Sequence, residues 1–186
     1  MAFLEVVRYN TNMKASIPFI EVTPSGQYVV SEEAKTFWAN VPSNTKIIVV
    51  VGKYRTGKSL LLNKCLLQNQ GDGDGFNVGG TINACTKGIW VYPEVIKMGS
   101  GHNVVVMDSE GIGALDANST HDTKIFALAL LLSSQFVYNS MGTIDESALE
   151  TLSLVLKISD QVRVSSDDDG SSLGELASYM PQFKWV

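Results

Sequence analysis

Residues 47–51 are five consecutive β-branched residues, and this run most constrains how the chain can fold. A strand with apolar side chains on both faces is typical of a parallel sheet that helices cover on both sides. Gly52 follows directly, and further apolar runs alternate with turn residues in a β-α-β-α order. The sequence therefore predicts an α/β domain with a mostly parallel central sheet flanked by helices.

The eight residues after this strand, 52–59, read G-K-Y-R-T-G-K-S and match the phosphate-binding pattern G-x-x-x-x-G-K-[ST]. Its glycines let successive backbone N–H groups turn inward around anionic oxygens. The Lys58 ammonium group can reach the β- and γ-phosphates of a nucleoside triphosphate, and the Ser59 hydroxyl can bind Mg²⁺. The predicted nucleotide contacts in this segment are Gly52, Lys53, Tyr54, Arg55, Thr56, Gly57, Lys58, Ser59 and Leu60.

A second strand-like run, residues 104–107, is followed by D-S-E-G at 108–111. A carboxylate at the tip of a buried strand can hold Mg²⁺ through a water molecule, because Mg²⁺ retains much of its hydration shell. The Gly111 amide can then face the γ-phosphate, so that the segment responds to the presence of that phosphate. We expect Asp108 to contribute to the metal site and Gly111 to contact the nucleotide.

The residues between these motifs, 81–90, read T-I-N-A-C-T-K-G-I-W. A hydrolase of the P-loop class needs a loop threonine whose hydroxyl completes the Mg²⁺ sphere and whose carbonyl faces the attacking water. Thr86, just before a predicted strand, is the better candidate for this metal-binding and catalytic role, and Thr81 is the second. An ordinary loop threonine is the alternative interpretation.

The remaining periodicity predicts one domain over residues 1–186, ending before the domain is complete, with an N-terminal extension over residues 1–17. Ser31 is the expected N-cap of a short helix that runs through Ala39. The other expected elements are helices at 59–68, 122–140 and 145–160, strands at 89–92, 104–107 and from 183 onward, and a glycine-rich loop at 70–80.

Composition excludes some classes of function. The net charge of −5 argues against a nucleic-acid-binding domain, which normally carries a basic surplus. Cys65 and Cys85 lack metal-ligand spacing and are expected to be buried thiols in a reducing compartment, with a single disulfide as the alternative. The longest apolar run, residues 125–132, is shorter than the ~20 residues that span a bilayer. We therefore expect a cytoplasmic protein, with membrane association possible only through segments outside this chain.

Neither histidine stands out as a functional residue in the sequence. His102 follows Gly101 and is expected in a turn. His121 falls in the expected loop 117–122, shortly after the 108–111 segment, and could touch the site, although a solvated loop position is the simpler interpretation.

Five segments carry a resemblance to a known family: G-K-Y-R-T-G-K-S at 52–59, T-K-G-I-W at 86–90, D-S-E-G at 108–111, I-F-A-L-A-L-L-L-S-S at 125–134 and F-V-Y-N-S-M-G-T-I at 136–144. Together they resemble guanylate-binding proteins, large GTPases related to atlastins and dynamins. The similarity runs from about Pro18 to Val186. It implies the N-terminal part of a Ras-like G domain with insertions, GTP and Mg²⁺ as ligands, and homodimerisation through the nucleotide-binding faces.

The resemblance also implies catalytic roles. Ile112 follows Gly111 at the position where small G proteins carry a glutamine, and an apolar side chain cannot orient water. By resemblance, Arg55 is an internal arginine finger, which would neutralise charge on the γ-phosphoryl group when two G domains meet. Glu110 would organise the water network indirectly. The expected catalytic residues are Arg55, Lys58, Thr86 and Glu110.

Three departures from the family pattern leave alternatives open. Ala84 occupies a position where the family commonly has a serine that relays the catalytic water. A non-hydrolysing, GTP-dependent interaction module is therefore the alternative function. Ser109 replaces the usual threonine, a mild change. The Arg-Asp pair that reads guanine would follow Val186, so guanine preference comes from the resemblance alone and an ATP-using protein is a third hypothesis.

Overall fold

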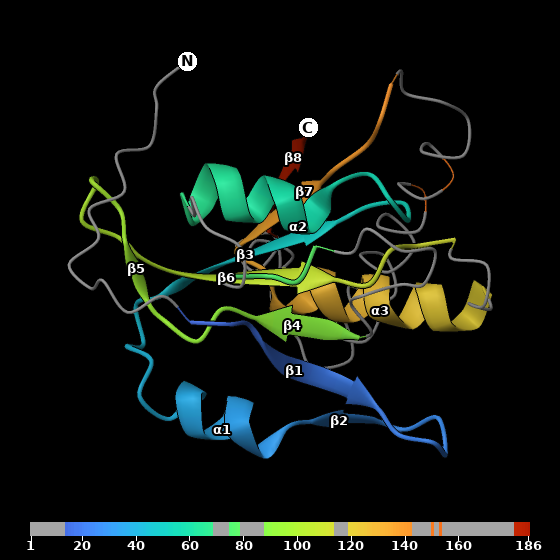
Figure 1. The fold of residues 1–186 in the computed structure, drawn as a ribbon, viewed down its shortest axis with the longest axis horizontal. Helices are drawn as coiled ribbons and strands as arrows, with labels where there is room; N and C mark the ends of the chain where they lie inside the picture. Colours follow the sequence, from blue (N-terminus) through green and yellow to red (C-terminus); the bar gives the residue numbers. More distant parts are fainter. Residues whose placement is uncertain are drawn as a thin grey trace, which may run out of the picture.

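The computed structural model describes residues 14–68, 75–78, 88–113, 119–142, 150, 153 and 181–186. In chain order the described elements are β1 (Ile17–Val22), β2 (Tyr28–Val30), α1 (Glu32–Trp38), β3 (Lys46–Val51), α2 (Lys58–Leu61), the π-helix η1 (Leu62–Leu66), β4 (Ile89–Val91), β5 (Ile96–Lys97), β6 (Asn103–Ser109), α3 (Ser119–Leu132), β7 (Gln135–Tyr138) and β8 (Gln182–Trp185). The strands form one sheet in the order β2-β1-β4-β6-β3-β7-β8, with β5 paired to β6 (Figure 1).

The sheet is mixed and divides at β6. On one side of this division β6, β3, β7 and β8 pair in parallel. On the other side β4 pairs antiparallel with β6, and β1 pairs antiparallel with both β4 and β2. The α/β fold class is therefore confirmed, and the parallel part is the half that contains the strand predicted from residues 47–51.

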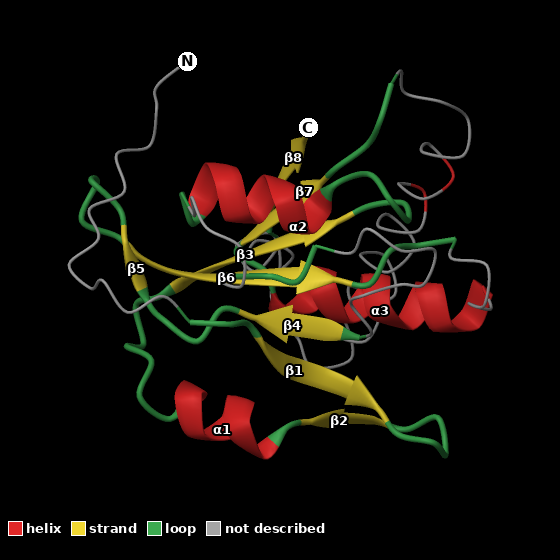
Figure 2. Ribbon diagram, in the orientation of Figure 1, coloured by secondary structure: helices red, strands yellow, loops and turns green. Residues whose placement is uncertain are grey.

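Helices cover both faces of this sheet, as Figure 2 shows for α2 and α3 on opposite sides of β3 and β6. Val49 and Val51 of β3 lie in one buried cluster with Phe126 of α3. Val50 lies in the other cluster, together with Leu62 of η1. Because alternate residues of a strand point to opposite faces, an all-apolar β3 supplies both cores at once.

The predicted short helix is present. Its N-cap is Ser31, whose Oγ accepts a hydrogen bond from the Ala34 amide at 3.0 Å. The predicted strands at 89–92, at 104–107 and from 183 onward correspond to β4, β6 and β8, with ends that differ by one to two residues.

The helix predicted for residues 59–68 ends earlier than expected, at Leu66, and its second part is a π-helix. Within η1 the Leu67 amide donates to the Leu62 carbonyl at 2.8 Å, the five-residue spacing of a π turn. This wide turn aligns Leu62 and Leu67 on one fully buried face. Cys65 is consequently exposed, so the expectation that it is a buried thiol is wrong. Cys85 lies outside the described residues.

The prediction of a long helix over residues 122–140 is wrong in its second half. α3 ends at Leu132, and the Ser134 amide donates to the Ile47 carbonyl at 2.9 Å instead of continuing the helix. The next residues form β7, which pairs in parallel with β3. Aromatic and β-branched residues such as Phe136 and Val137 favour a strand when an adjacent strand edge is available.

Other predictions are only partly within the described residues. Glu150 and Ser153 alone are described from the helix predicted for 145–160. In the loop predicted for 70–80, Phe76 is held by the buried Asn63 side chain, which bonds both its amide and its carbonyl, at 2.8 and 2.7 Å. β1 begins at Ile17, the last residue of the expected extension. The assignment of residues 1–186 to one domain stays a prediction.

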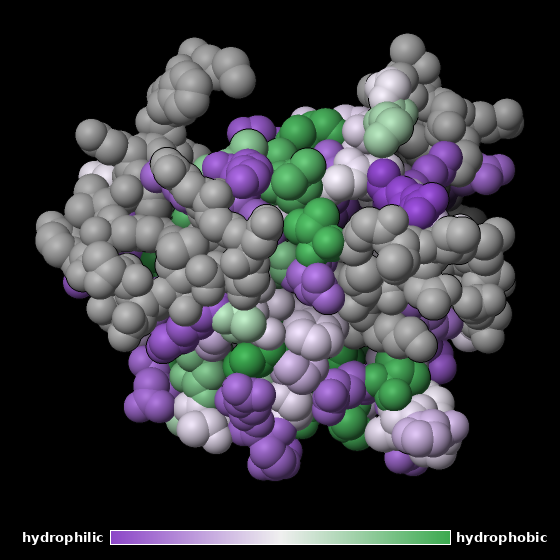
Figure 3. Space-filling view, viewed as in Figure 1, coloured by the Kyte–Doolittle hydropathy of each residue, from purple (hydrophilic) through white to green (hydrophobic). Residues whose placement is uncertain are grey.

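The surface of the described part is mixed in character. On the face shown in Figure 3, hydrophilic and hydrophobic residues alternate over the region of α1 and the β1–β2 hairpin. Among the helices of the described part, none combines the length and the apolar character needed to cross a bilayer.

Candidate functional site

The two predicted phosphate-site segments follow adjacent parallel strands. β3 and β6 pair with Val50 opposite Asp108, so residues 52–59 and 108–111 leave the same edge of the sheet. Backbone bonds then hold the two segments together. The Ile112 amide donates to the Gly52 carbonyl at 3.1 Å, and the Tyr54 amide donates to the Ile112 carbonyl at 2.9 Å. The structure therefore brings together the two motifs that the sequence identified separately.

Two glycines permit close approach within this site. A Cβ atom at Gly111 would lie 2.6 Å from the Tyr54 Cα and 3.1 Å from the Lys58 Nζ. A Cβ atom at Gly52 would lie 2.0 Å from the Asn139 carbonyl oxygen. Side chains at these positions would therefore displace the loop that carries Lys58.

The loop between these glycines is held in a curled conformation. Arg55 and Gly57 have φ values of 64° and 84°, in the left-handed region. The Thr56 hydroxyl donates to the Lys53 carbonyl at 2.9 Å, and the Lys58 Nζ donates to the same carbonyl at 3.0 Å. The loop thus curls around the Lys58 ammonium group.

Lys58 is a buried cation, with 7% of its surface exposed. Burial lowers the pKa of its ammonium group, while the nearby carboxylates of Asp108 and Glu110 oppose that shift. A polyanionic ligand at this position would favour the charged form and offset the cost of desolvation.

Ser59 and Asp108 form the second part of the site. The Ser59 hydroxyl donates to Asp108 Oδ2 at 2.5 Å, and Asp108 is fully buried at the end of β6. A hydroxyl oxygen and a carboxylate oxygen are the hard ligands that Mg²⁺ prefers, so these two residues fit a magnesium ion. Thr86, the third predicted metal ligand, lies outside the described residues, as do Thr81 and Ala84.

Arg55, Tyr54 and Leu60 lie toward the surface. Arg55 is exposed, and its guanidinium carbon lies 5.4 Å from the centroid of the Tyr54 ring. Leu60 is 48% exposed in α2. The described contacts therefore leave Lys58, Ser59 and Asp108 as the enclosed centre of the site, with Arg55 at its rim.

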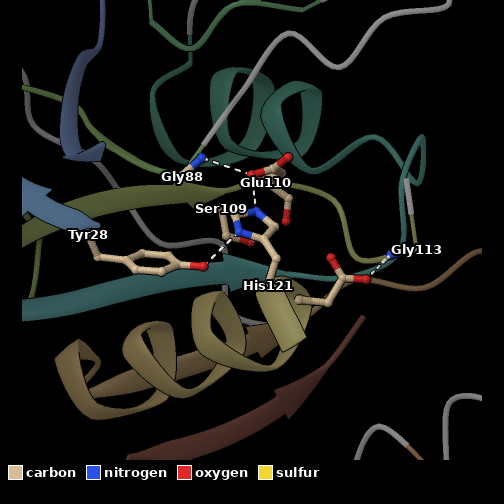
Figure 4. A network of polar contacts seen from close by, with 7 residues as sticks. Tyr28, Gly88, Ser109, Glu110, Gly113 and His121 are labelled. Carbon is tan, nitrogen blue, oxygen red and sulfur yellow. Dashed lines mark hydrogen bonds and ion pairs between the residues drawn. The ribbon is translucent and has the colours of Figure 1, made fainter. Parts of the chain in front are cut away.

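Glu110 lies one residue beyond β6, and its buried side chain is part of a polar network (Figure 4). Glu110 Oε2 accepts from the Gly88 amide at 3.0 Å and lies 2.9 Å from His121 Nε2. His121 Nδ1 lies 2.7 Å from the Tyr28 hydroxyl. The expectation of a solvated loop position for His121 is therefore wrong, because α3 begins at Ser119 and carries it toward Glu110.

Sequence reasoning also missed Asn139 and Asp122. Asn139 Nδ2 donates to the Thr56 carbonyl at 2.8 Å, so the residue after β7 supports the phosphate-binding loop. Asp122 Oδ2 accepts from the Gly113 amide at 2.8 Å and holds the segment after Gly111. Asn139 reaches the site because β7 pairs with β3, whereas Asp122 reaches Gly113 from the first turn of α3.

Comparison with known proteins agrees with this geometry. The family described as guanylate-binding protein, N-terminal domain, matches residues 25–186. The chain is 37% identical over 179 residues to human guanylate-binding protein 2, covering 94% of this chain and 29% of that protein. It is 36% identical over 179 residues to guanylate-binding protein 1 of Chlorocebus aethiops, covering 94% of this chain and 30% of that protein.

A third relative is human guanylate-binding protein 7, 38% identical over 165 residues, covering 87% of this chain and 25% of that protein. The chain thus spans 25 to 30% of the length of these curated relatives. Nearly all of the chain nevertheless matches, including the loop around Lys58 and the Asp108 strand end. The chain therefore belongs to the guanylate-binding protein family, in its N-terminal domain.

Proposed function

We propose that this domain binds GTP with Mg²⁺ and hydrolyses it to GDP and phosphate. The observation that carries the proposal is the hydrogen bond of 2.5 Å between Ser59 Oγ and Asp108 Oδ2, directly beside the buried Lys58. Two hard oxygen ligands next to a desolvated cation suit the charge of a magnesium triphosphate. Membership in a family whose members are named for binding guanylate favours guanine as the base.

The loop would hold the phosphates through its backbone amides and one lysine side chain. The backbone amides of residues 52–59 surround the phosphate oxygens, and the Lys58 ammonium group approaches the β- and γ-phosphates. Ser59, Asp108 and Thr86 would hold the metal ion, and a bound Mg²⁺ would supply neutralising charge at the phosphates.

Hydrolysis requires that a water molecule attack the γ-phosphorus while the bond to the bridging oxygen breaks. Thr86 orients this water through its carbonyl, and the Gly111 amide contacts the γ-phosphate. Glu110 organises the surrounding water indirectly. Ile112, which is partly buried, has no group that can take over the orientation of water.

Arg55 supplies the remaining positive charge. Its position on the exposed rim of the loop allows it to swing over the phosphates when a second copy of the domain covers the site. This arrangement predicts a homodimer formed through the nucleotide-binding faces. Hydrolysis would then depend on protein concentration.

Ala84 supports a second candidate function. The family commonly has a serine at this position, and loss of one hydroxyl from a water relay would slow hydrolysis while leaving binding intact. The domain would then be an interaction module controlled by bound GTP. In that case Ala84→Ser should raise the hydrolysis rate.

Single-turnover reactions with GTP and with ATP, each with Mg²⁺, separate these functions. Release of phosphate from GTP and not from ATP supports the proposed GTPase. Tight GTP binding without phosphate release supports the interaction module. Absence of saturable binding of either nucleotide to the folded protein contradicts both proposals.

A further inference from the structure

A continuous chain of polar contacts connects the β2 edge of the sheet to the proposed catalytic segment (Figure 4). It runs from the Tyr28 hydroxyl to His121 Nδ1 at 2.7 Å, from His121 Nε2 to Glu110 Oε2 at 2.9 Å, and from Glu110 Oε2 to the Gly88 amide at 3.0 Å. These four residues come from β2, α3 and the facing ends of β6 and β4. The contacts therefore join four elements of the fold, and the Tyr28–His121 contact spans 93 residues of the sequence.

The partners determine how protons are arranged in this chain. An ionised Glu110 can only accept hydrogen bonds, so both the Gly88 amide and His121 Nε2 act as donors. In a neutral imidazole, Nδ1 then accepts a hydrogen bond from the Tyr28 hydroxyl. Every contact in the chain is thus a complementary donor and acceptor pair.

Gly88 is fixed in position from several sides. Its φ of 76° lies in the left-handed region, and a Cβ atom there would lie 2.0 Å from the Ile20 carbonyl oxygen. The Gly88 carbonyl accepts from the Glu110 amide at 2.8 Å, while the Glu110 carboxylate accepts from the Gly88 amide. The Glu110 side chain is therefore one of the contacts that fix where the chain enters β4, two residues after Thr86.

His121 holds the Glu110 carboxylate, and Tyr28 holds His121. The His121 and Glu110 side chains are 20% and 11% exposed, so water competes little for their hydrogen bond. The Tyr28 ring stacks on the imidazole at a centroid distance of 5.9 Å and an interplanar angle of 23°. One hydrogen bond and one ring contact thus fix the orientation of the imidazole.

We infer that His121 and Tyr28 are positioning residues for GTP hydrolysis: they fix the Glu110 carboxylate and, through it, Gly88 at the end of the segment that carries Thr86. The inference rests on the proposed function. It predicts effects on the chemical step and not on nucleotide affinity, because Glu110, through which both side chains act, is assigned to the water network and not to nucleotide binding. His121 acts through Glu110 and is not itself a catalytic residue.

The test compares His121→Ala, His121→Gln and Tyr28→Phe with wild type in the full chain. We expect His121→Ala to slow single-turnover GTP hydrolysis about tenfold, since loss of an outer partner of a functional carboxylate has effects of this size. GTP affinity should change by less than about twofold, because only the chemical step is affected. His121→Gln, whose amide can still donate to Glu110, should restore most of the rate.

Tyr28→Phe keeps the ring contact and should slow hydrolysis roughly threefold, the effect of one hydrogen bond. His102→Ala is the matched control, since His102 is exposed and its imidazole Nδ1 lies 3.1 Å from the nearby Ser100 carbonyl. A wild-type rate in His121→Ala overturns the inference. The inference is also overturned if His121→Ala and His121→Gln lose the same fraction of the hydrolysis rate and both have lower thermal stability. That result indicates a structural role alone.

The Gly88 amide gives a readout that does not depend on hydrolysis. In isotope-labelled protein its resonance should shift upfield and exchange faster with solvent in His121→Ala, as the hydrogen bond to Glu110 weakens. If wild type releases no phosphate, the proposed GTPase function fails. The resonance and the solvent exchange of the Gly88 amide in His121→Ala then still test whether His121 positions Glu110 and Gly88. An unchanged Gly88 amide in His121→Ala would overturn that claim.

Discussion

Asn139 donates a hydrogen bond of 2.8 Å from its side-chain amide to the carbonyl oxygen of Thr56, 83 residues earlier in the chain. Asn139 directly follows β7, and its own amide donates to the Val51 carbonyl at 2.7 Å. One residue thus connects the end of the central strand β3 to the loop that surrounds Lys58. The proposed phosphate site is therefore supported from both of the strands adjacent to β3.

Asn139→Ala should weaken GTP binding about tenfold, because the Thr56 carbonyl loses its buried partner and the loop loses one fixed point. Titration with a fluorescent GTP analogue measures the change. Asn40→Ala is the control, since Asn40 makes the same kind of bond to the Thr36 carbonyl at an exposed helix end. Equal affinities for wild type and Asn139→Ala would show that the contact does not order the loop.

Lys58→Ala should lower the affinity for the nucleotide by at least about a hundredfold, because it removes the buried ammonium group at the phosphates. Without nucleotide its melting temperature should not fall, since burial already disfavours the charged form of Lys58. Calorimetric titration and thermal melts measure the two effects. The exposed Lys35→Ala serves as control. Wild-type affinity in Lys58→Ala contradicts the site assignment.

Arg55→Ala should bind GTP normally and lose the acceleration that comes with dimer formation, about a thousandfold if Arg55 is an arginine finger. Arg55→Lys keeps the charge without the planar fork and should recover only a small part of the rate. The measurement is the hydrolysis rate as a function of protein concentration. A rate in Arg55→Ala that still rises with concentration as in wild type rejects the finger role.

Tyr28 predicts a pH dependence of stability. Burial raises the pKa of its hydroxyl above the ordinary 10.0, and the Glu110 and Asp122 carboxylates raise it further. The folded state then retains a proton that the unfolded chain loses, so stability falls as the pH rises above 10.0. His121 and Lys124 also face the ring, Lys124 at 5.4 Å from its centroid.

Tyr28→Phe lacks this ionisation and should lose stability less steeply than wild type over the same alkaline range. Chemical denaturation at a series of pH values measures the difference between the two slopes. If the free energy of unfolding falls with pH at the same slope in wild type and Tyr28→Phe, the Tyr28 hydroxyl has the same pKa in the folded and unfolded chains.

The sequence by itself predicted the strand at residues 47–51, the loop that follows it and the closeness of Lys58, Ser59 and Asp108, whose roles stay predictions. These features depend on neighbours in the chain. A run of β-branched residues specifies a strand buried on both faces, and a glycine-bounded loop before a helix forms an anion site from its own backbone. Parallel strands then place Asp108 beside Ser59, because their carboxyl ends share one edge of the sheet.

Only the tertiary structure decided the positions of Asn139 and His121 and the end of α3 at Leu132. An apolar stretch such as residues 125–138 fits either a buried helix or a buried strand, and the free edge of β3 selects the strand for β7. That pairing brings Asn139 to the phosphate-binding loop. The packing of α3 on the sheet likewise turns His121 toward Glu110. The Asn139–Thr56 contact spans 83 residues, and the His121–Glu110 contact depends on where α3 begins and how it packs on the sheet. No local sequence pattern therefore predicts either contact.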